Sequence, residues 1–143
     1  MGHKLHLRVC PFFAHEAKDI VRTEDWSDVS VRVFPRLCCH SNVAETTVQR
    51  LCEASSRRGP TVILLGSCLG ARGGTPRIGA RETCRLYHVP LCFHLLLPEK
   101  DVDRHLRDGD YLITPGWLRH WRRQMREWHF DAPTARTFFA ESA

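Results

Sequence analysis

The chain has 143 residues, of which 43% are hydrophobic and 26% are charged, and its formal net charge is +5. This length suits one ordinary domain, and the composition excludes a disordered chain because it supplies enough apolar side chains for a core. No apolar run approaches the ~20 residues of a membrane helix, and the first residues lack the apolar stretch of a secretory signal. We therefore expect a cytoplasmic protein without a membrane partner.

Two strands are predicted in the first third of the chain. Apolar and polar residues alternate in Leu5–Phe13 and again in Val29–Leu37, which is the pattern of a strand with one buried face. Helical spacing of apolar residues predicts a helix between them, over Ala14–Val21. A capping signal at 41–45 predicts a further helix, with Cys52 on its inward face.

Three more strands are expected in the rest of the chain. Thr61–Leu65 is a continuous apolar run, which is typical of a strand buried on both faces of a parallel sheet. Leu91–Leu97 predicts a fourth strand, and Tyr111–Thr114 predicts a fifth. The helices expected in this half run from Thr75 toward His88, around Val102 and Leu106, and from Trp117 onward.

This alternation of strands and helices predicts the fold class. Short connections between alternating elements imply right-handed crossovers and helices on both faces of the sheet. We expect a single α/β domain with a doubly wound, mostly parallel, five-stranded sheet of the flavodoxin-like or Rossmann-like kind. Functional residues are then expected beyond the carboxyl ends of the strands.

Soft metal ligands recur at those predicted strand ends. Thiolates and imidazoles bind zinc, ferrous iron or an iron–sulfur cluster, each of which takes about four such donors. No Cys-x-x-Cys pair is present, so local spacing alone gives no zinc-ribbon or ferredoxin signature. Whether His88 or His94 joins the site is left open. The candidate metal ligands are Cys10, Cys39, His40, Cys68 and Cys92, of which Cys92 lies near the start of the fourth predicted strand and fits this pattern less well.

The remaining cysteines have a plainer interpretation. Cys52 and Cys84 are expected to be small apolar residues of the core. Seven cysteines is an odd number, their spacing is irregular, and a reducing compartment disfavours a disulfide framework.

The chain offers further candidate sites around the last predicted strand and helix. Thr114, Gly116 and Trp117 follow the fifth predicted strand and are candidate cofactor-binding residues, with Trp117 as a pocket wall or as a packing residue. The final helix is amphipathic, so its tryptophans are expected in the core and its arginines in solvent, and nucleic acid is not an expected partner. The glycine-rich loop after Leu65 matches neither standard nucleotide motif and is expected to be a turn.

The order of three segments resembles one known family. Gly66-Ser67-Cys68, the run that begins at Cys92, and Asp110-Tyr111-Leu112-Ile113-Thr114-Pro115-Gly116-Trp117 are similar to segments of the uncharacterised domain-of-unknown-function family 1638. The resemblance implies a cysteine-bearing α/β domain of anaerobes, often near corrinoid-dependent methyltransferases. It likens Cys10, Cys68 and Cys92 to the family's cysteines, and His40 to its histidine after the second strand. Pro90 stands where the family has another histidine.

These observations lead to one expected function and one alternative. We expect a metal- or iron–sulfur-binding sensory or regulatory domain, a shortened relative or an excised domain of a longer sensor with a downstream signalling module as partner. The alternative is a small thiol-dependent transferase or corrinoid-linked accessory enzyme with Cys68 as nucleophile or ligand. Binding ranks above catalysis because no carboxylate is evident that would orient a histidine beside the thiol.

Overall fold

The computed structural model describes residues 4–37, 45–56, 59–66 and 83–141. Within these ranges four strands form one sheet, in the order β2-β1-β3-β4. Every neighbouring pair is parallel, so the predicted α/β class with a parallel sheet is confirmed, whereas the count of five strands is not. The strands are β1 (Leu5–Val9), β2 (Val29–Val33), β3 (Thr61–Leu65) and β4 (Cys84–His88).

The central strands carry most of the sheet's buried residues. β3 lies between β1 and β4, and its Thr61, Ile63 and Leu65 are all buried. Leu7 of β1 is in register with Val31 on one side and Val62 on the other. The continuous apolar run of β3 therefore forms the inner strand that its pattern predicted.

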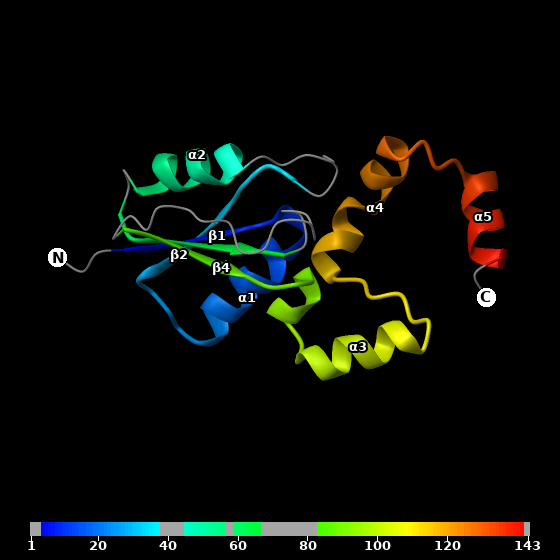
Figure 1. Cartoon of the computed structure of the whole chain (residues 1–143), viewed down its shortest axis with the longest axis horizontal. Coiled ribbons are helices and arrows are strands. Elements are labelled where there is room, and N and C mark those ends of the chain that lie inside the picture. The colour runs from blue at the N-terminus through cyan, green and yellow to red at the C-terminus, as the bar shows by residue number, and fades with distance from the viewer. Residues whose placement is uncertain (1–3, 38–44, 57–58, 67–82, 142–143) are drawn as a thin grey trace.

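Helices cover both faces of this sheet. α1 (Ala14–Thr23) packs against β2, and α2 (Glu45–Ser56) packs against β3 and β4. The chain steps from β1 outward to β2 and then back past β1 to β3, so right-handed crossovers place the two helices on opposite faces. Figure 1 shows α2 above the sheet and α1 below it.

The remaining elements lie beyond the carboxyl ends of the strands, at the side of the molecule away from the N-terminus (Figure 1). α4 packs against α1 and against the short 3-10 helix η1 that follows β1. None of the described helices is long and apolar enough to cross a membrane. These elements are η1 (Pro11–Phe13), η3 (Cys92–Leu95), α3 (Glu99–Arg107), α4 (Pro115–Glu127) and α5 (Ala132–Glu141).

Two predicted strands are not strands in the structure. The run Leu91–Leu97 contains the 3-10 helix η3, because the position beside β3 is taken by β4, where a helix was predicted. β4 alternates buried and exposed residues, with Cys84 buried and Tyr87 exposed, as expected of an edge strand. The segment Tyr111–Thr114 leads directly into α4, and Thr114 caps that helix.

The first two strands end earlier than predicted. Pro11 begins η1, and Pro35 follows shortly after β2, so neither position can donate a ladder hydrogen bond. Phe34 still donates its backbone N–H to Val9 O at 3.1 Å, which holds the exit of β2 beside the exit of β1. Both exits are thereby fixed at one edge of the sheet.

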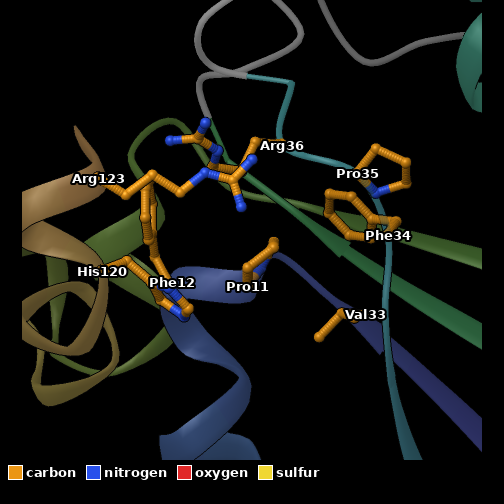
Figure 2. Close-up of a pocket in the computed structure, with 8 residues that line it drawn as sticks. All are labelled: Pro11, Phe12, Val33, Phe34, Pro35, Arg36, His120 and Arg123. Carbon is orange, nitrogen blue, oxygen red and sulfur yellow. The ribbon is translucent and has the colours of Figure 1, made fainter. Parts of the chain in front are cut away.

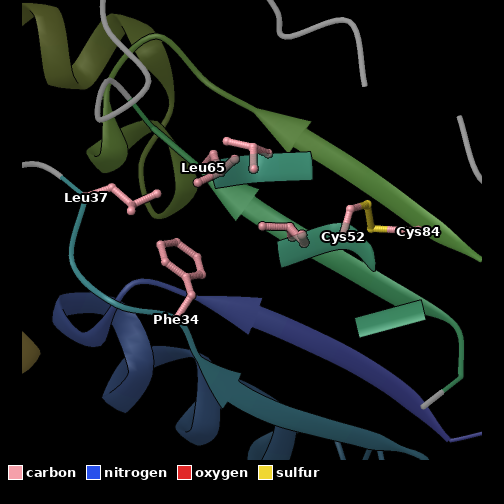
Figure 3. Packing of buried hydrophobic residues seen from close by; sticks show 7 residues of the cluster. Phe34, Leu37, Cys52, Leu65 and Cys84 are labelled. Atoms are coloured by element: carbon pink, nitrogen blue, oxygen red, sulfur yellow. A yellow bond between two sulfur atoms is a disulfide. The ribbon is translucent and has the colours of Figure 1, made fainter. Parts of the chain in front are cut away.

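A disulfide lies in the core beneath α2. Cys52 of α2 and Cys84 of β4 are 2% and 6% exposed and are joined by this bond (Figure 3). Their place in the core is as predicted, but the bond between them was not predicted. The buried cluster consists of Phe34, Leu37, Val48, Cys52, Ile63, Leu65 and Cys84.

Candidate functional site

Two of the five predicted metal ligands lie within the described residues. Cys10 is half-buried directly after β1, where it precedes η1 and packs against the core. Cys92 is half-buried in η3, and a Cβ added to Gly66 would collide with its Sγ and lie 2.7 Å from its Cα. Gly66 follows β3, so both thiols lie at the carboxyl ends of neighbouring strands.

The other predicted ligands, Cys39, His40 and Cys68, lie outside the described residues. Within the described part of the chain, no three side chains of His, Cys, Asp or Glu are grouped so that they could hold a metal ion. The predicted metal site therefore stays a prediction.

The two histidines left open by the sequence have different surroundings. His88 is the last residue of β4 and is half-buried. His94 accepts a hydrogen bond at Nδ1 from the backbone N–H of Leu91, at 3.3 Å. Its Nε2 is buried and has no hydrogen-bond partner among the described groups.

Thr114, Gly116 and Trp117 hold α4 in place. Thr114 Oγ1 accepts the Trp117 N–H at 2.9 Å and donates to Phe12 O at 2.8 Å. The Gly116 N–H donates to Glu16 Oε1 at 2.9 Å. These bonds satisfy two backbone N–H groups in the first turn of α4 and connect this turn to η1 and α1. Their suggested role in cofactor binding stays a prediction.

A pocket of about 510 Å³ opens beside these elements, at the carboxyl ends of β1 and β2. Figure 2 shows its walls: apolar side chains from the two strand exits face basic side chains from the β2 exit and α4. In open parallel sheets this edge is the usual place for a ligand. The lining residues are Pro11, Phe12, Val33, Phe34, Pro35, Arg36, His120 and Arg123.

Arg36 joins the β2 exit to the inner face of α4. Its guanidinium donates to Oε1 of Gln124, which is 1% exposed, and to Oε2 of Glu127. It also lies over the ring of Phe12, with its Cζ 5.6 Å from the ring centre. The Phe12 ring is in turn 6.2 Å from that of His120. Residues far apart in the sequence are thus held around one pocket.

Two arginines share one carboxylate at this pocket. Arg123 Nε donates to Glu127 Oε1 at 2.9 Å, so the single carboxylate of Glu127 serves two guanidinium groups. Two guanidinium groups therefore lie beside this carboxylate, at the mouth of a pocket whose walls are largely apolar. The Arg123 side chain is 70% exposed, so its outer nitrogens are accessible to a solute. A pair of arginines at a pocket mouth favours an anionic ligand.

The two arginines lower the pKa of Glu127. The hydrogen bond from Arg36, followed by that from Arg123, holds the pKa of this carboxyl below its ordinary value. A lowered folded-state pKa stabilises the fold above the unfolded-state value, and this contribution is lost as the pH falls through the folded-state pKa.

We expect Arg36→Gln to raise the pKa of Glu127 toward its ordinary value, because the larger of the two stabilising contacts is removed. Carboxyl carbon NMR during an acid titration measures it. Arg123→Gln is the comparison and should give a smaller rise. An unchanged Glu127 titration in the Arg36 variant would mean that the two side chains are not in contact in solution.

No pattern in the sequence singles out Arg36. An isolated arginine after a strand looks like any other surface cation, and its partner Gln124 lies 88 positions further along the chain. Only the docking of α4 beside the β2 exit brings the two together. Comparison with family models, curated proteins and solved structures finds no match to this chain, so the family resemblance stays a prediction.

Proposed function

We propose that the pocket at the β1 and β2 exits binds a small organic anion, and that the domain is a regulatory or sensory binding module. The observation that carries this proposal is the pair of arginines, Arg36 and Arg123, around the single carboxylate of Glu127. Guanidinium groups bind carboxylates and phosphates through two parallel hydrogen bonds.

The other walls of the pocket indicate the rest of the ligand. Phe12 offers an aromatic ring, and Val33 is 50% exposed at this edge although it is apolar. A volume of about 510 Å³ lies in the usual range for sites that take small organic molecules. We therefore propose a ligand with an apolar or aromatic body and one carboxylate or phosphate group.

Phenyl phosphate and benzoate are suitable probes, and benzamide is the neutral control. We expect saturable binding of the two anions by titration calorimetry and no measurable binding of benzamide. Arg123→Gln should weaken anion binding by about tenfold or more, because a charge-assisted hydrogen bond is lost.

Arg119→Gln is the matched control, since Arg119 is an exposed arginine of the same helix that does not line the pocket. Its affinity for the anions should equal that of the unaltered protein. Equal losses in both variants would mean that only the overall positive charge attracts the anions, and the proposed site would be wrong.

The fold we propose for this module is flavodoxin-like, with four of its five strands found in the part of the chain that the structure describes. The order β2-β1-β3-β4 corresponds to the first four positions of the order 2-1-3-4-5. The direction in which successive strands are added to the sheet reverses between β1 and β3, and the pocket lies beside this point, on the β2 side of β1.

A second candidate function is binding of a soft transition metal, zinc or an iron–sulfur cluster at the same edge. It is favoured by the thiols of Cys10 and Cys92 at the exits of neighbouring strands. Two thiols are fewer than such a centre needs, so Cys39, His40 or Cys68 would have to supply the others. Elemental analysis of anaerobically purified protein tests this, with Cys92→Ser expected to lower a stoichiometric metal content.

A further inference from the structure

The apolar side of α4 faces away from the body of the protein. The side that packs on η1 and α1 carries the buried Gly116 and Gln124, whereas Leu118, Trp121 and Trp128 are 53%, 44% and 54% exposed. The prediction that the tryptophans of this helix lie in the core is wrong for Trp121 and Trp128. Burying glutamine and exposing tryptophan reverses the usual arrangement of an amphipathic helix.

This outward side forms one wall of an apolar groove. The groove has a volume of about 650 Å³, and the loop before α4 and the turn after it supply its other walls. Tyr111 and Ile113, in that loop, are 56% and 51% exposed. An exposed apolar patch of this kind marks an interaction site. The groove residues are Tyr111, Leu112, Ile113, Trp117, Met125, Trp128 and Phe130.

A row of positive charge runs along the same helix beside the apolar residues. Arg119, Arg122 and Arg126 are exposed and are spaced by three and four residues, which places them on one side of α4. Among the residues that the structure describes, none of the three forms an ion pair with a carboxylate. Arg122 instead lies over the Trp121 ring, with its Cζ 5.4 Å from the ring centre.

The carboxylates near this surface have other partners. Asp110 bonds to His105 at 2.7 Å, Asp131 accepts the Thr134 N–H at 2.8 Å, and Glu127 is held by Arg36 on the inner side of α4. The arginine row is therefore not neutralised by these groups. A partner that covers the groove would complement it best by bringing acidic residues of its own.

We propose that this groove docks an amphipathic helix of a partner protein, with an apolar face flanked by acidic residues. Helices bind grooves through apolar residues at i, i+3, i+4 and i+7, and flanking charges select the partner and its orientation. The net charge of +5 disfavours a second copy of the same chain as the occupant. The residues that line this groove and those that line the proposed anion pocket do not overlap, so the two proposals stand separately.

A pair of synthetic peptides tests the charge complementarity. Both peptides are amphipathic helices with the same leucine and phenylalanine face, and glutamate flanks that face in one peptide while lysine replaces it in the other. The labelled glutamate peptide should bind the unaltered protein in a fluorescence anisotropy titration, and the lysine peptide should bind at least about tenfold more weakly.

Variants locate the binding. Trp128→Ala and the double change Arg122→Glu with Arg126→Glu should each weaken binding of the glutamate peptide by about tenfold or more, and the double variant should now prefer the lysine peptide. Arg85→Glu is the matched control, since it reverses an exposed arginine on β4 and should leave the affinity unchanged.

Several results would overturn the proposal. These are equal affinity for the two peptides, binding of neither, or a loss of affinity in the Arg85 variant as large as in the double variant. The proposal would also be wrong if neither peptide binds, while the unaltered protein binds phosphatidylserine vesicles and the groove variants do not. The occupant would then be a membrane surface. Self-association that is lost in Trp128→Ala, without peptide binding, would identify a second copy as the occupant.

Discussion

Reduction of the disulfide between Cys52 and Cys84 is expected to lower the free energy of unfolding by about 3 to 4 kcal/mol. The bond closes a loop with a sequence separation of 32 and joins α2 to the edge strand β4. Without it the unfolded chain regains the entropy that this closure removes. Both sulfurs are buried, so the reduced pair also leaves two thiols to repack in the core.

Urea denaturation with and without dithiothreitol measures the effect. The double variant Cys52→Ala with Cys84→Ala is the control, and its stability should not respond to the reductant. A peptide map of the unreduced protein should contain the Cys52–Cys84 cross-link. If the map lacks it and dithiothreitol leaves the stability of the unaltered protein unchanged, the two residues are thiols in solution.

The bond also bears on where the protein works. The cytoplasm of most organisms keeps thiols reduced, whereas structural disulfides persist in oxidising compartments. The expectation of a cytoplasmic protein therefore stays a prediction. The free energy of unfolding of the reduced form determines what fraction of the protein stays folded in a reducing compartment.

The second large effect is expected from Gly116→Ala, which should destabilise the docking of α4 by about 1 to 3 kcal/mol. A Cβ at this position would collide with the backbone oxygen of Phe12 and lie 2.9 Å from both Phe12 C and Glu16 Oε2. Because these contacts include backbone atoms, the helix itself has to move. That movement would break the hydrogen bonds from Thr114 to Phe12 and from Gly116 to Glu16.

The same change should abolish phenyl phosphate binding, because Arg123 and His120 reach the pocket from α4. Gly109→Ala is the control. A Cβ there meets nothing within 4 Å, so its cost is limited to the left-handed backbone at φ 80°, about 1 kcal/mol. Its anion affinity should be unchanged. Unaltered stability and anion binding in Gly116→Ala would show that α4 does not dock through its first turn.

The inner part of the fold could be predicted because its chemistry is local. Thr61–Leu65 is largely apolar and short, which favours an inner strand, and the parallel order follows from the alternation of elements. β4 was missed because an edge strand needs apolar residues on one face only, and Cys84–His88 contains too few of them to exclude a helix. The apolar run at Leu91–Leu97 was a stronger signal and was assigned the strand instead.

The sequence predicted where in the fold the site lies, but not which residues form it. The rule that ligands bind at the carboxyl ends of parallel strands led to Cys10, whereas Cys92 was expected near the start of a predicted strand and fitted the rule less well. The structure places both thiols at that edge. The rule could not identify Arg36, because the role of this residue depends on a helix that is distant in sequence. Nor could periodicity show which side of α4 faces inward, since Gly116, Thr114 and Glu16 determine that docking through hydrogen bonds.

The two proposals share α4. Arg123 reaches the anion pocket from its inner side, and Trp128 lines the groove on its outer side. This arrangement suits a regulatory module that senses a small molecule and contacts a downstream signalling partner, which is the role we propose.

The central claim is that a small organic anion binds between the β2 exit and α4. Nuclear Overhauser contacts between the protons of phenyl phosphate and the side chains of the protein test it most directly. Contacts to Phe12, Val33 and His120, with the largest amide shifts at the β2 exit and along α4, are the predicted result. Contacts confined to the tryptophan groove, or to scattered surface arginines, would contradict the claim.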